Sequence, residues 1–248
     1  KRKEAPEAET KPSPEIAGVE ELPVDPVRRA IAQRMLQSAQ QIPHAWTMME
    51  ADVSGLVARV GSAKEEFRRR EGVNLTYLPF VIQAVVNALK AHPLANSTWT
   101  EDKIVLKKSV NIGIAVDREE GLIVPVIKDA DQKSVAALAN EVHKLAEKAR
   151  QNKLSVQDVQ DGTFTVNNTG ALGAILSMPI INPPQAGIIT SEAVVKRPVV
   201  IDDAIAIRSI MNLCLSFDHR ILDGGAATAF LKSVKSGLEA IGPDMVIY

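Results

Sequence analysis

Hydrophobic residues recur along much of the chain with the spacing of amphipathic helices. Val27, Ile31 and Met35 repeat on one face, which predicts a helix that begins at Pro26 with Asp25 as its N-cap. Similar periodicity predicts further helices over residues 53–70, 79–92, 134–145 and 230–241. The helix over 79–92 is apolar on nearly every side, so we expect it to be buried between layers.

Runs rich in β-branched residues predict strands between these helices. They cover residues 47–53, 103–107, 110–116, 122–128, 163–167, 186–190 and 205–217. Pro125 predicts an edge or a bulge for its strand, because proline has no N–H to donate. Helices and strands follow each other without a regular βαβ period or an internal repeat. We therefore expect an α/β fold with a mixed sheet layered with helices.

Composition predicts where the domain begins, and the net charge indicates which classes of partner to expect. The chain has 248 residues, 46% of them hydrophobic, which is enough for a buried core. Residues 1–20 instead contain four basic residues, five Glu and three Pro, and predict a flexible linker before one domain over residues 21–248. A net charge of −1 gives no electrostatic reason to expect nucleic acid or an anionic membrane as a partner.

The cysteine count and the length of the apolar runs indicate the cellular location of the protein. Cys214 is a single cysteine and cannot form an internal disulfide, and no apolar run approaches the roughly 20 residues of a membrane span. We expect an intracellular protein with a buried thiol. No second His and no Cys pair stands at ligand spacing, so no metal site is predicted.

Among the histidines, His219 has the setting of a functional residue. It follows the strand predicted over 205–217 and precedes Gly224 and Gly225, which allow close approach of a ligand to the backbone. A neutral imidazole can take a proton from a hydroxyl or a thiol, and Asp223 could orient it or balance an arginine. The alternative is a loop histidine paired with an acid. The other histidines are interpreted as surface or capping residues: His44, His92 and His143.

The polar turn that follows residues 163–167 is the second candidate. One interpretation is a hairpin in which asparagines satisfy the turn backbone, and the residues alone favour it. The other is that the Asn167 amide donates a hydrogen bond to a developing oxyanion. Such a bond contributes about 3 to 4 kcal/mol in other enzymes.

Four motifs, in order and spacing, resemble the catalytic domain of the dihydrolipoyl acyltransferases, the core component of 2-oxo acid dehydrogenase complexes. They are GLIVP at 121–125, GTFT at 162–165, PIINPP at 179–184 and DHRILDG at 218–224. The resemblance covers residues 22–248. Three further runs are similar to the bacterial branched-chain enzymes: IPHAW at 42–46, TVNNTG at 165–170 and NLCLS at 212–216.

The resemblance implies a chloramphenicol-acetyltransferase-like fold and trimers with active sites at subunit interfaces, assembled into a large hollow core. It explains residues 1–20 as the linker to subunit-binding and lipoyl domains upstream of this sequence. The implied reaction transfers an acyl group between the thiol of dihydrolipoyl-lysine and coenzyme A, which is a substrate. The implied partners are further copies of the chain, lipoyl domains, and the 2-oxo acid decarboxylase and dihydrolipoyl dehydrogenase components of the complex.

The resemblance also implies roles for the residues of the DHRILDG motif. His219 would act as general base on the coenzyme A thiol, which is mostly protonated at neutral pH because its pKa is about 8.5. Asp223 would hold the turn, and its ion-pair partner is left open among three arginines: Arg28, Arg29 and Arg34.

One position departs from the pattern of the family. Most members have a serine that donates to the oxyanion where this chain has Asn167, and an amide can also donate there. Asn168 or Thr169 could serve instead. Contacts with the bound substrates are expected from Ile123, Asn167 and Ser177.

These implications favour a branched-chain acyltransferase, with a pyruvate-type acetyltransferase as the near alternative. They also imply a location in the bacterial cytoplasm, with the mitochondrial matrix as the alternative. A scaffold core of the same fold without catalysis is the alternative from another class, and the presence of both His219 and Asp223 argues against it. A free-standing antibiotic acetyltransferase shares the His-x-x-x-Asp spacing, but the linker and the GLIVP motif argue against it.

Overall fold

The computed structural model describes residues 20, 22–118 and 121–248, so the predicted linker lies almost wholly outside the described residues. The helices that it shows agree with those predicted to within a few residues, except that the last begins earlier. They are α1 (Pro26–Gln41), α2 (Ser54–Glu71), α3 (Leu78–Ala91), α4 (Val135–Arg150) and α5 (Gly224–Glu239). Short 3₁₀ turns lie between some of the elements, among them η3 (Val156–Val159) and η4 (Thr169–Leu172).

Local sequence explains where several helices begin and end. The Asp25 carboxylate accepts a hydrogen bond from the Arg28 N–H at 2.8 Å, and Ser134 accepts one from the Ala137 N–H at 3.2 Å. Both side chains satisfy N–H groups that have no partner within the helix. Helix α2 ends at Gly72, whose φ of 76° is a left-handed conformation that glycine adopts without strain.

The main sheet is mixed, as predicted, with the strand order β1-β9-β7-β6-β4-β5. The pairs β4–β6 and β6–β7 are parallel, and the other pairs are antiparallel. Strand β5 is at one edge, which confirms the position predicted from Pro125. The bounds are β1 (His44–Asp52), β4 (Ile112–Ile114), β5 (Val126–Ile127), β6 (Phe164–Asn167), β7 (Gly187–Ser191) and β9 (Ala204–Asp218).

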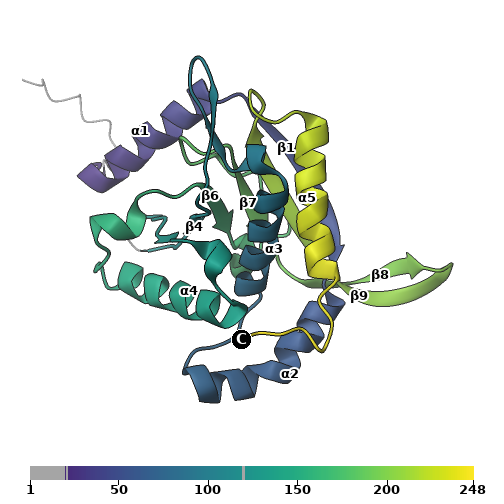
Figure 1. Ribbon diagram of the computed structural model, residues 1–248. Helices are drawn as coiled ribbons and strands as arrows, with labels where there is room; N and C mark the ends of the chain where they lie inside the picture. The colour runs from purple at the N-terminus through teal and green to yellow at the C-terminus, as the bar shows by residue number, and fades with distance from the viewer. Residues whose placement is uncertain (1–19, 21, 119–120) are drawn as a thin grey trace, which may run out of the picture.

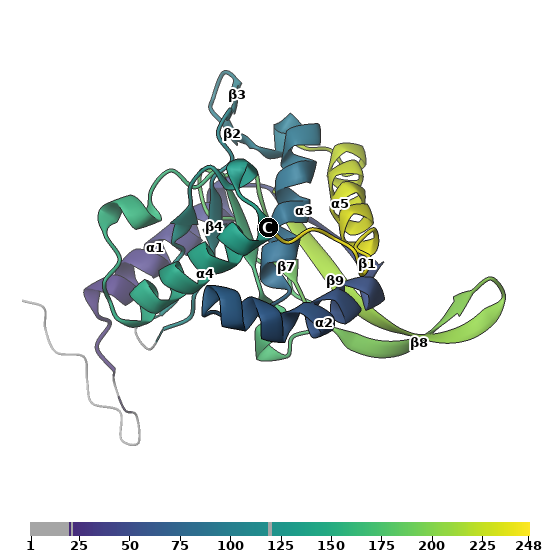
Figure 2. The same cartoon turned by 60° about the horizontal axis from the view of Figure 1, so that its bottom comes forward.

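Two hairpins project from this body (Figure 2). Strand β8 (Val195–Ile201) pairs with the first half of β9, and β2 (Ser97–Trp99) pairs with β3 (Ile104–Leu106) in a separate small sheet. The sequence did not predict β8 or β2. The outward side chains of the β8–β9 hairpin include Val200 and Ile205, which are exposed.

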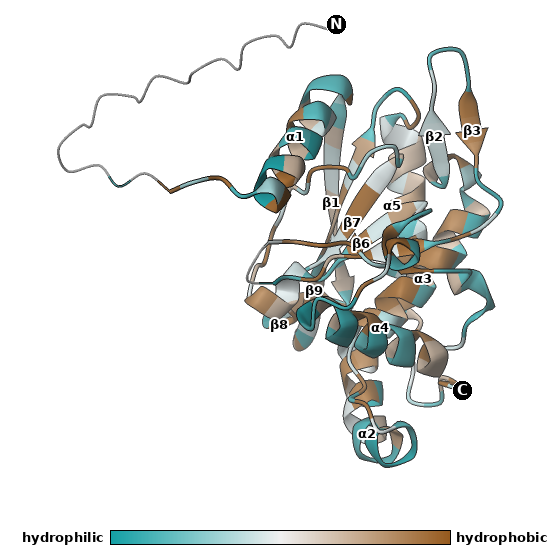
Figure 3. Ribbon diagram, turned by 90° about the vertical axis from the view of Figure 1, so that its left-hand side faces the viewer, coloured by the Kyte–Doolittle hydropathy of each residue, from teal (hydrophilic) through white to brown (hydrophobic). Residues whose placement is uncertain are grey.

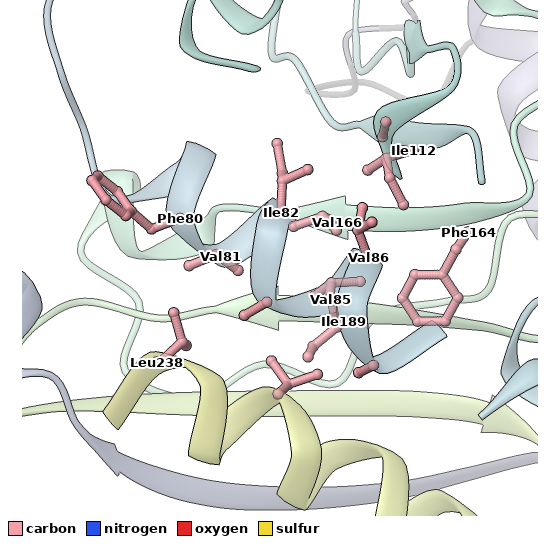
Figure 4. Close-up of a cluster of buried hydrophobic side chains, with 14 of the residues drawn as sticks. Phe80, Val81, Ile82, Val85, Val86, Ile112, Phe164, Val166, Ile189 and Leu238 are labelled. Carbon is pink, nitrogen blue, oxygen red and sulfur yellow. The ribbon is translucent and has the colours of Figure 1, made fainter. Parts of the chain in front are cut away.

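The helices α3, α4 and α5 pack on one face of the sheet, and α3 lies between the other two (Figure 1). Its side chains meet the sheet and α5 in one apolar cluster, shown in Figure 4. The prediction that this helix is buried between layers is therefore confirmed. Figure 3 shows the same division, with apolar strands and α3 inside and polar surfaces on α1, α2 and α4.

Side chains of β9 alternate between two different environments. Leu213 and Leu215 point into the apolar cluster under the helices. Asn212 and Cys214 point to the opposite face, where Asn212 donates a hydrogen bond to the Ile175 carbonyl at 2.7 Å. The segment 168–185 thus covers this second face, and the sheet is buried on both sides here.

The apolar cluster predicts a clear effect of one truncation. Phe164 is fully buried, and its ring lies 5.5 Å from that of Phe230. Phe164→Ala should lower the free energy of unfolding by about 3–5 kcal/mol, because it removes apolar contacts and leaves a cavity. The thermal midpoint at matched protein concentration measures this, with the exposed Leu106→Ala as the control. Equal midpoints in the two variants would contradict the packing described.

Candidate functional site

His219 stands in a tight turn at the end of β9. Its backbone N–H donates to the Pro43 carbonyl at 3.0 Å, which fixes the turn against the start of β1. The ring is exposed and lies 5.8 Å from the Phe217 ring. Within the described residues neither ring nitrogen has a hydrogen-bond partner, so both nitrogens can bind a ligand.

An ion pair that the sequence did not reveal holds this turn. The Asp218 carboxylate is 2% exposed and accepts bonds from Arg220 Nε at 2.9 Å and from Nη2 at 2.7 Å. The hydrogen bonds to Asp218 raise the pKa of the Arg220 guanidinium above its ordinary value. Such a bidentate pair has a fixed geometry, so it orients the backbone on both sides of His219.

Asp223 occupies the start of α5. Its Oδ1 accepts a hydrogen bond from the Ala226 N–H at 2.7 Å, so the carboxylate is the N-cap of this helix. The ion pair considered with an arginine of α1 is not formed among the described residues of one chain. Arg34, one of the three candidates, donates instead to the Pro183 carbonyl at 3.1 Å.

Asn167 ends β6 and is half-buried. Strand β6 runs parallel to the next strand of the sheet, β7, so the hairpin interpretation of this turn is wrong. Asn167 pairs in register with Thr190, and within the described part of the chain its side-chain amide has no hydrogen-bond partner. Both N–H groups of the amide are therefore free to donate.

The two predicted contact residues lie towards the same end of the sheet as Asn167. Ile123 forms a bridge with Val116, which lies just beyond the end of β4, next to β6. The Ser177 hydroxyl donates to Glu192 Oε2 at 3.2 Å, and that oxygen also accepts from Thr169, two residues after Asn167. The structure thus brings Asn167, Ile123 and Ser177 to one region.

His219 and Asn167 lie far apart within one chain. Asn167 is level with Thr190, and Thr190 pairs with Cys214 of β9. His219 is five residues beyond Cys214, which corresponds to about 17 Å along the strand at about 3.4 Å per residue. No single chain can place both side chains around one reacting atom.

A cavity of about 510 Å³ opens beside the histidine turn. It is lined by the residues on either side of His219, together with residues of α1, the β2–β3 hairpin and the 183–184 turn. No group of three or more potential metal ligands occurs among the described residues, and none of the described helices is long and apolar enough to cross a membrane.

The chain belongs to the 2-oxoacid dehydrogenases acyltransferase (catalytic domain) family, which matches residues 17–246. It is 51% identical, over 98% of its length, to the lipoamide acyltransferase component of the branched-chain alpha-keto acid dehydrogenase complex of Bacillus subtilis. The chain spans 60% of the length of that relative.

Solved structures share the fold. A probable dihydrolipoamide acetyltransferase from Listeria monocytogenes superposes with a TM-score of 0.92 at 51% identity, covering 94% of this chain and all of that one. Two more have a TM-score of 0.88 at 34% identity and cover 94% of this chain and 98% of theirs. One was determined for the role of a serine, a histidine and an asparagine in the mechanism of the Azotobacter vinelandii dihydrolipoamide acetyltransferase, and the other is the cubic core of a pyruvate dehydrogenase multienzyme complex. The predicted family and fold class are therefore confirmed.

The buried cysteine gives a direct test of strand packing near this site. Burial raises the pKa of the Cys214 thiol above its ordinary value, and the side chain is fully inaccessible. Because the thiolate is the reactive form, native protein at mildly alkaline pH should not react with a disulfide reagent such as DTNB. Protein unfolded in guanidinium should react with DTNB and release one equivalent of thionitrobenzoate per chain, because the chain has one cysteine. Rapid reaction of the native protein would contradict the described pairing of β7 with β9.

Proposed function

We propose that this chain is the catalytic domain of a dihydrolipoyl acyltransferase that transfers branched-chain acyl groups between the dihydrolipoyl thiol and coenzyme A. The observation that carries the proposal is the spacing of three residues. In the Azotobacter acetyltransferase, the histidine studied for its role in the mechanism lies 52 positions after the serine and four positions before the asparagine. In this chain His219 follows Asn167 and precedes Asp223 by the same intervals.

His219 is the proposed general base. Its ring is free of other hydrogen bonds in the described structure, and the Asp218–Arg220 pair fixes the turn that carries it. The imidazole removes the proton of the coenzyme A thiol, and the thiolate forms a bond with the thioester carbonyl carbon. When the tetrahedral intermediate breaks down, the bond to the dihydrolipoyl sulfur is cleaved and the imidazolium returns the proton to that sulfur.

Asn167 is the proposed donor to the oxyanion of the tetrahedral intermediate. Its two N–H groups have no competing acceptor among the described residues, whereas the Thr169 hydroxyl is already bound to Glu192. This favours Asn167 over Thr169 for the role. An amide aimed at the carbonyl oxygen replaces the serine of most family members and stabilises the negative charge as it develops.

The distance between these two groups requires a site built from two copies of the chain. One copy supplies His219 and its neighbour supplies Asn167. The segment after Asn167 exposes several large apolar side chains, which a second copy would cover. They are Leu172, Ile175, Leu176, Met178 and Ile180. The cubic core of the related pyruvate dehydrogenase complex supports self-association of this kind into trimers and a hollow particle.

The remaining predicted residues take supporting roles in this proposal. Asp223 caps α5 and thereby fixes the end of the histidine turn, while Ile123 and Ser177 line the substrate path near Asn167. Residues 1–20 are proposed as the linker to upstream lipoyl and subunit-binding domains. The other components of the complex, a 2-oxo acid decarboxylase and a dihydrolipoyl dehydrogenase, act with it in the bacterial cytoplasm.

A steady-state assay with dihydrolipoamide tests the reaction and the acyl preference together. We expect isobutyryl- and isovaleryl-coenzyme A to be better acyl donors than acetyl-coenzyme A. His219→Ala should lower kcat by about 10² to 10⁴, the usual contribution of a general base, without changing the size of the particle. His143→Ala, on the outer helix α4, is the control and should keep full activity. Unchanged activity in the His219 variant would rule out the proposed base, and a preference for acetyl-coenzyme A would indicate the pyruvate type.

Co-assembly of two variants tests the two-chain site. His219→Ala and Asn167→Ala particles should each be strongly impaired, the latter by about 10² to 10³ in kcat. When the two chains are co-expressed, about a quarter of the interfaces should pair an intact His219 with an intact Asn167 and regain activity, if mixing in the closed oligomer is random. Separately assembled particles mixed afterwards are the control. Failure of the co-assembled particles to regain activity would contradict a shared site.

A further inference from the structure

Glu192 has an unusual environment beside the proposed oxyanion site. It follows β7 and is 2% exposed. Its Oε2 accepts hydrogen bonds from the Thr169 hydroxyl at 2.6 Å and the Ser177 hydroxyl at 3.2 Å. Its Oε1 accepts one from the Thr190 hydroxyl at 2.6 Å. Three hydroxyl groups from separate points of the chain thus converge on one buried carboxyl group.

The Glu192 carboxyl group has no cationic partner in the part of the chain that the structure describes. Among the described residues, none of the Lys, Arg or His nitrogens lies within ion-pair distance of Glu192, although buried acidic side chains are usually paired with a cation. Burying an acidic group without a cationic partner costs stability that an apolar residue of similar size would not cost. A gain other than folding stability would account for a carboxyl group at this position.

The Glu192 carboxyl group connects the segment that follows Asn167 to the sheet. Thr169 and Ser177 lie at two points of this segment, and Thr190 is the register partner of Asn167 on β7. The backbone is tightly packed at the same place, since a Cβ on Gly170 would lie 2.3 Å from the Glu192 carbonyl carbon. The Glu192 N–H also donates to the Asn212 carbonyl of β9 at 3.0 Å.

From this geometry we infer that Glu192 is a positioning residue for the acyl-transfer reaction, which holds the Asn167 amide at the place where the oxyanion develops. The inference rests on the proposed function. Glu192 does not contact the reacting atoms in this scheme. It fixes the backbone two residues after Asn167 through Thr169, and fixes the neighbouring strand through Thr190. Displacement of a catalytic group by about 1 Å can cost about 10²-fold in rate, so anchoring of this kind has a large effect on turnover.

Two variants remove the anchor in different ways. Glu192→Met keeps the approximate length of the side chain but accepts none of the three hydrogen bonds. Thr169→Val removes a single hydroxyl from a half-buried position and has less effect on folding. We expect kcat to fall by up to about 10²-fold in Glu192→Met and by less in Thr169→Val. KM for coenzyme A should stay unchanged in Thr169→Val, because the Ser177 hydroxyl, which lines the proposed substrate path, keeps its bond to Glu192 in this variant. In Glu192→Gln the amide oxygen can accept from the Thr169 and Ser177 hydroxyls, and the amide N–H can donate to the Thr190 oxygen, so this variant should recover most of the activity.

A double-mutant cycle with Asn167→Ala separates positioning from general destabilisation. Once the amide is removed, Glu192→Met and Thr169→Val should cause no further loss of kcat. Thr163→Val is the matched control. It removes a buried hydroxyl at the opposite end of β6, bound to the Asn111 carbonyl at 3.2 Å, and should leave kcat unchanged in both backgrounds.

The outcomes distinguish this inference from the proposed function. If wild-type protein transfers acyl groups but Thr169→Val and Glu192→Met keep wild-type kcat, Glu192 has no positioning role. The inference would also be overturned if Glu192→Met and Thr169→Val lowered kcat by the same factor in the Asn167→Ala background as in the wild-type background. Wild-type protein without acyl transfer would overturn the proposed function and the inference with it. Should Glu192→Met fail to fold, as its thermal midpoint would show, Thr169→Val alone decides.

Discussion

The register of strand β9 is the constraint on which both parts of the site depend. This strand pairs with β1 on one side and with β7 on the other, so its alternation decides which residues face the helices. A shift of one residue would turn Cys214 towards the apolar cluster and Leu213 away from it. The same register places Asn167 level with Cys214 and His219 at the far end of the sheet. Their separation is therefore a property of strand pairing and not of any loop.

The two ends of the sheet present a reactive group in similar ways. At one end, Arg220 donates to Asp218 and the Ala226 N–H donates to Asp223, so these groups are bonded to each other and the His219 ring stays free. At the other end, the Thr169 and Thr190 hydroxyls donate to the Glu192 carboxyl group, and the Asn167 amide stays free. In both places a satisfied polar network fixes the backbone and leaves one side chain available, which is the preorganisation that transition-state stabilisation needs.

A site divided between two chains suits the chemistry proposed for it. Both proposed substrates are long thiols or thioesters, and a channel between two subunits would let them approach from opposite sides while excluding water from the thioester. The division also ties activity to assembly, because His219 and Asn167 of a lone chain belong to two different half-sites. The exposed apolar residues after Asn167 fit this view, since they lie beside the half-site that a neighbouring chain would complete.

Local chemistry in the sequence was enough for most helices and for one catalytic candidate. Capping at Asp25 depends on residues only three positions apart, and the β-branched content of β9 and the glycines after His219 are equally local, so these features were predicted. The β8–β9 hairpin, the parallel course of β6 and β7, and the contacts of Glu192 were not. Glu192 meets Thr169 across 23 positions of sequence, and no local pattern records such a meeting. The sequence by itself determined most of the elements and the family. Only the tertiary structure decided which polar groups converge and that His219 and Asn167 lie apart, because strand order and register arise from long-range pairing, which residue spacing does not encode.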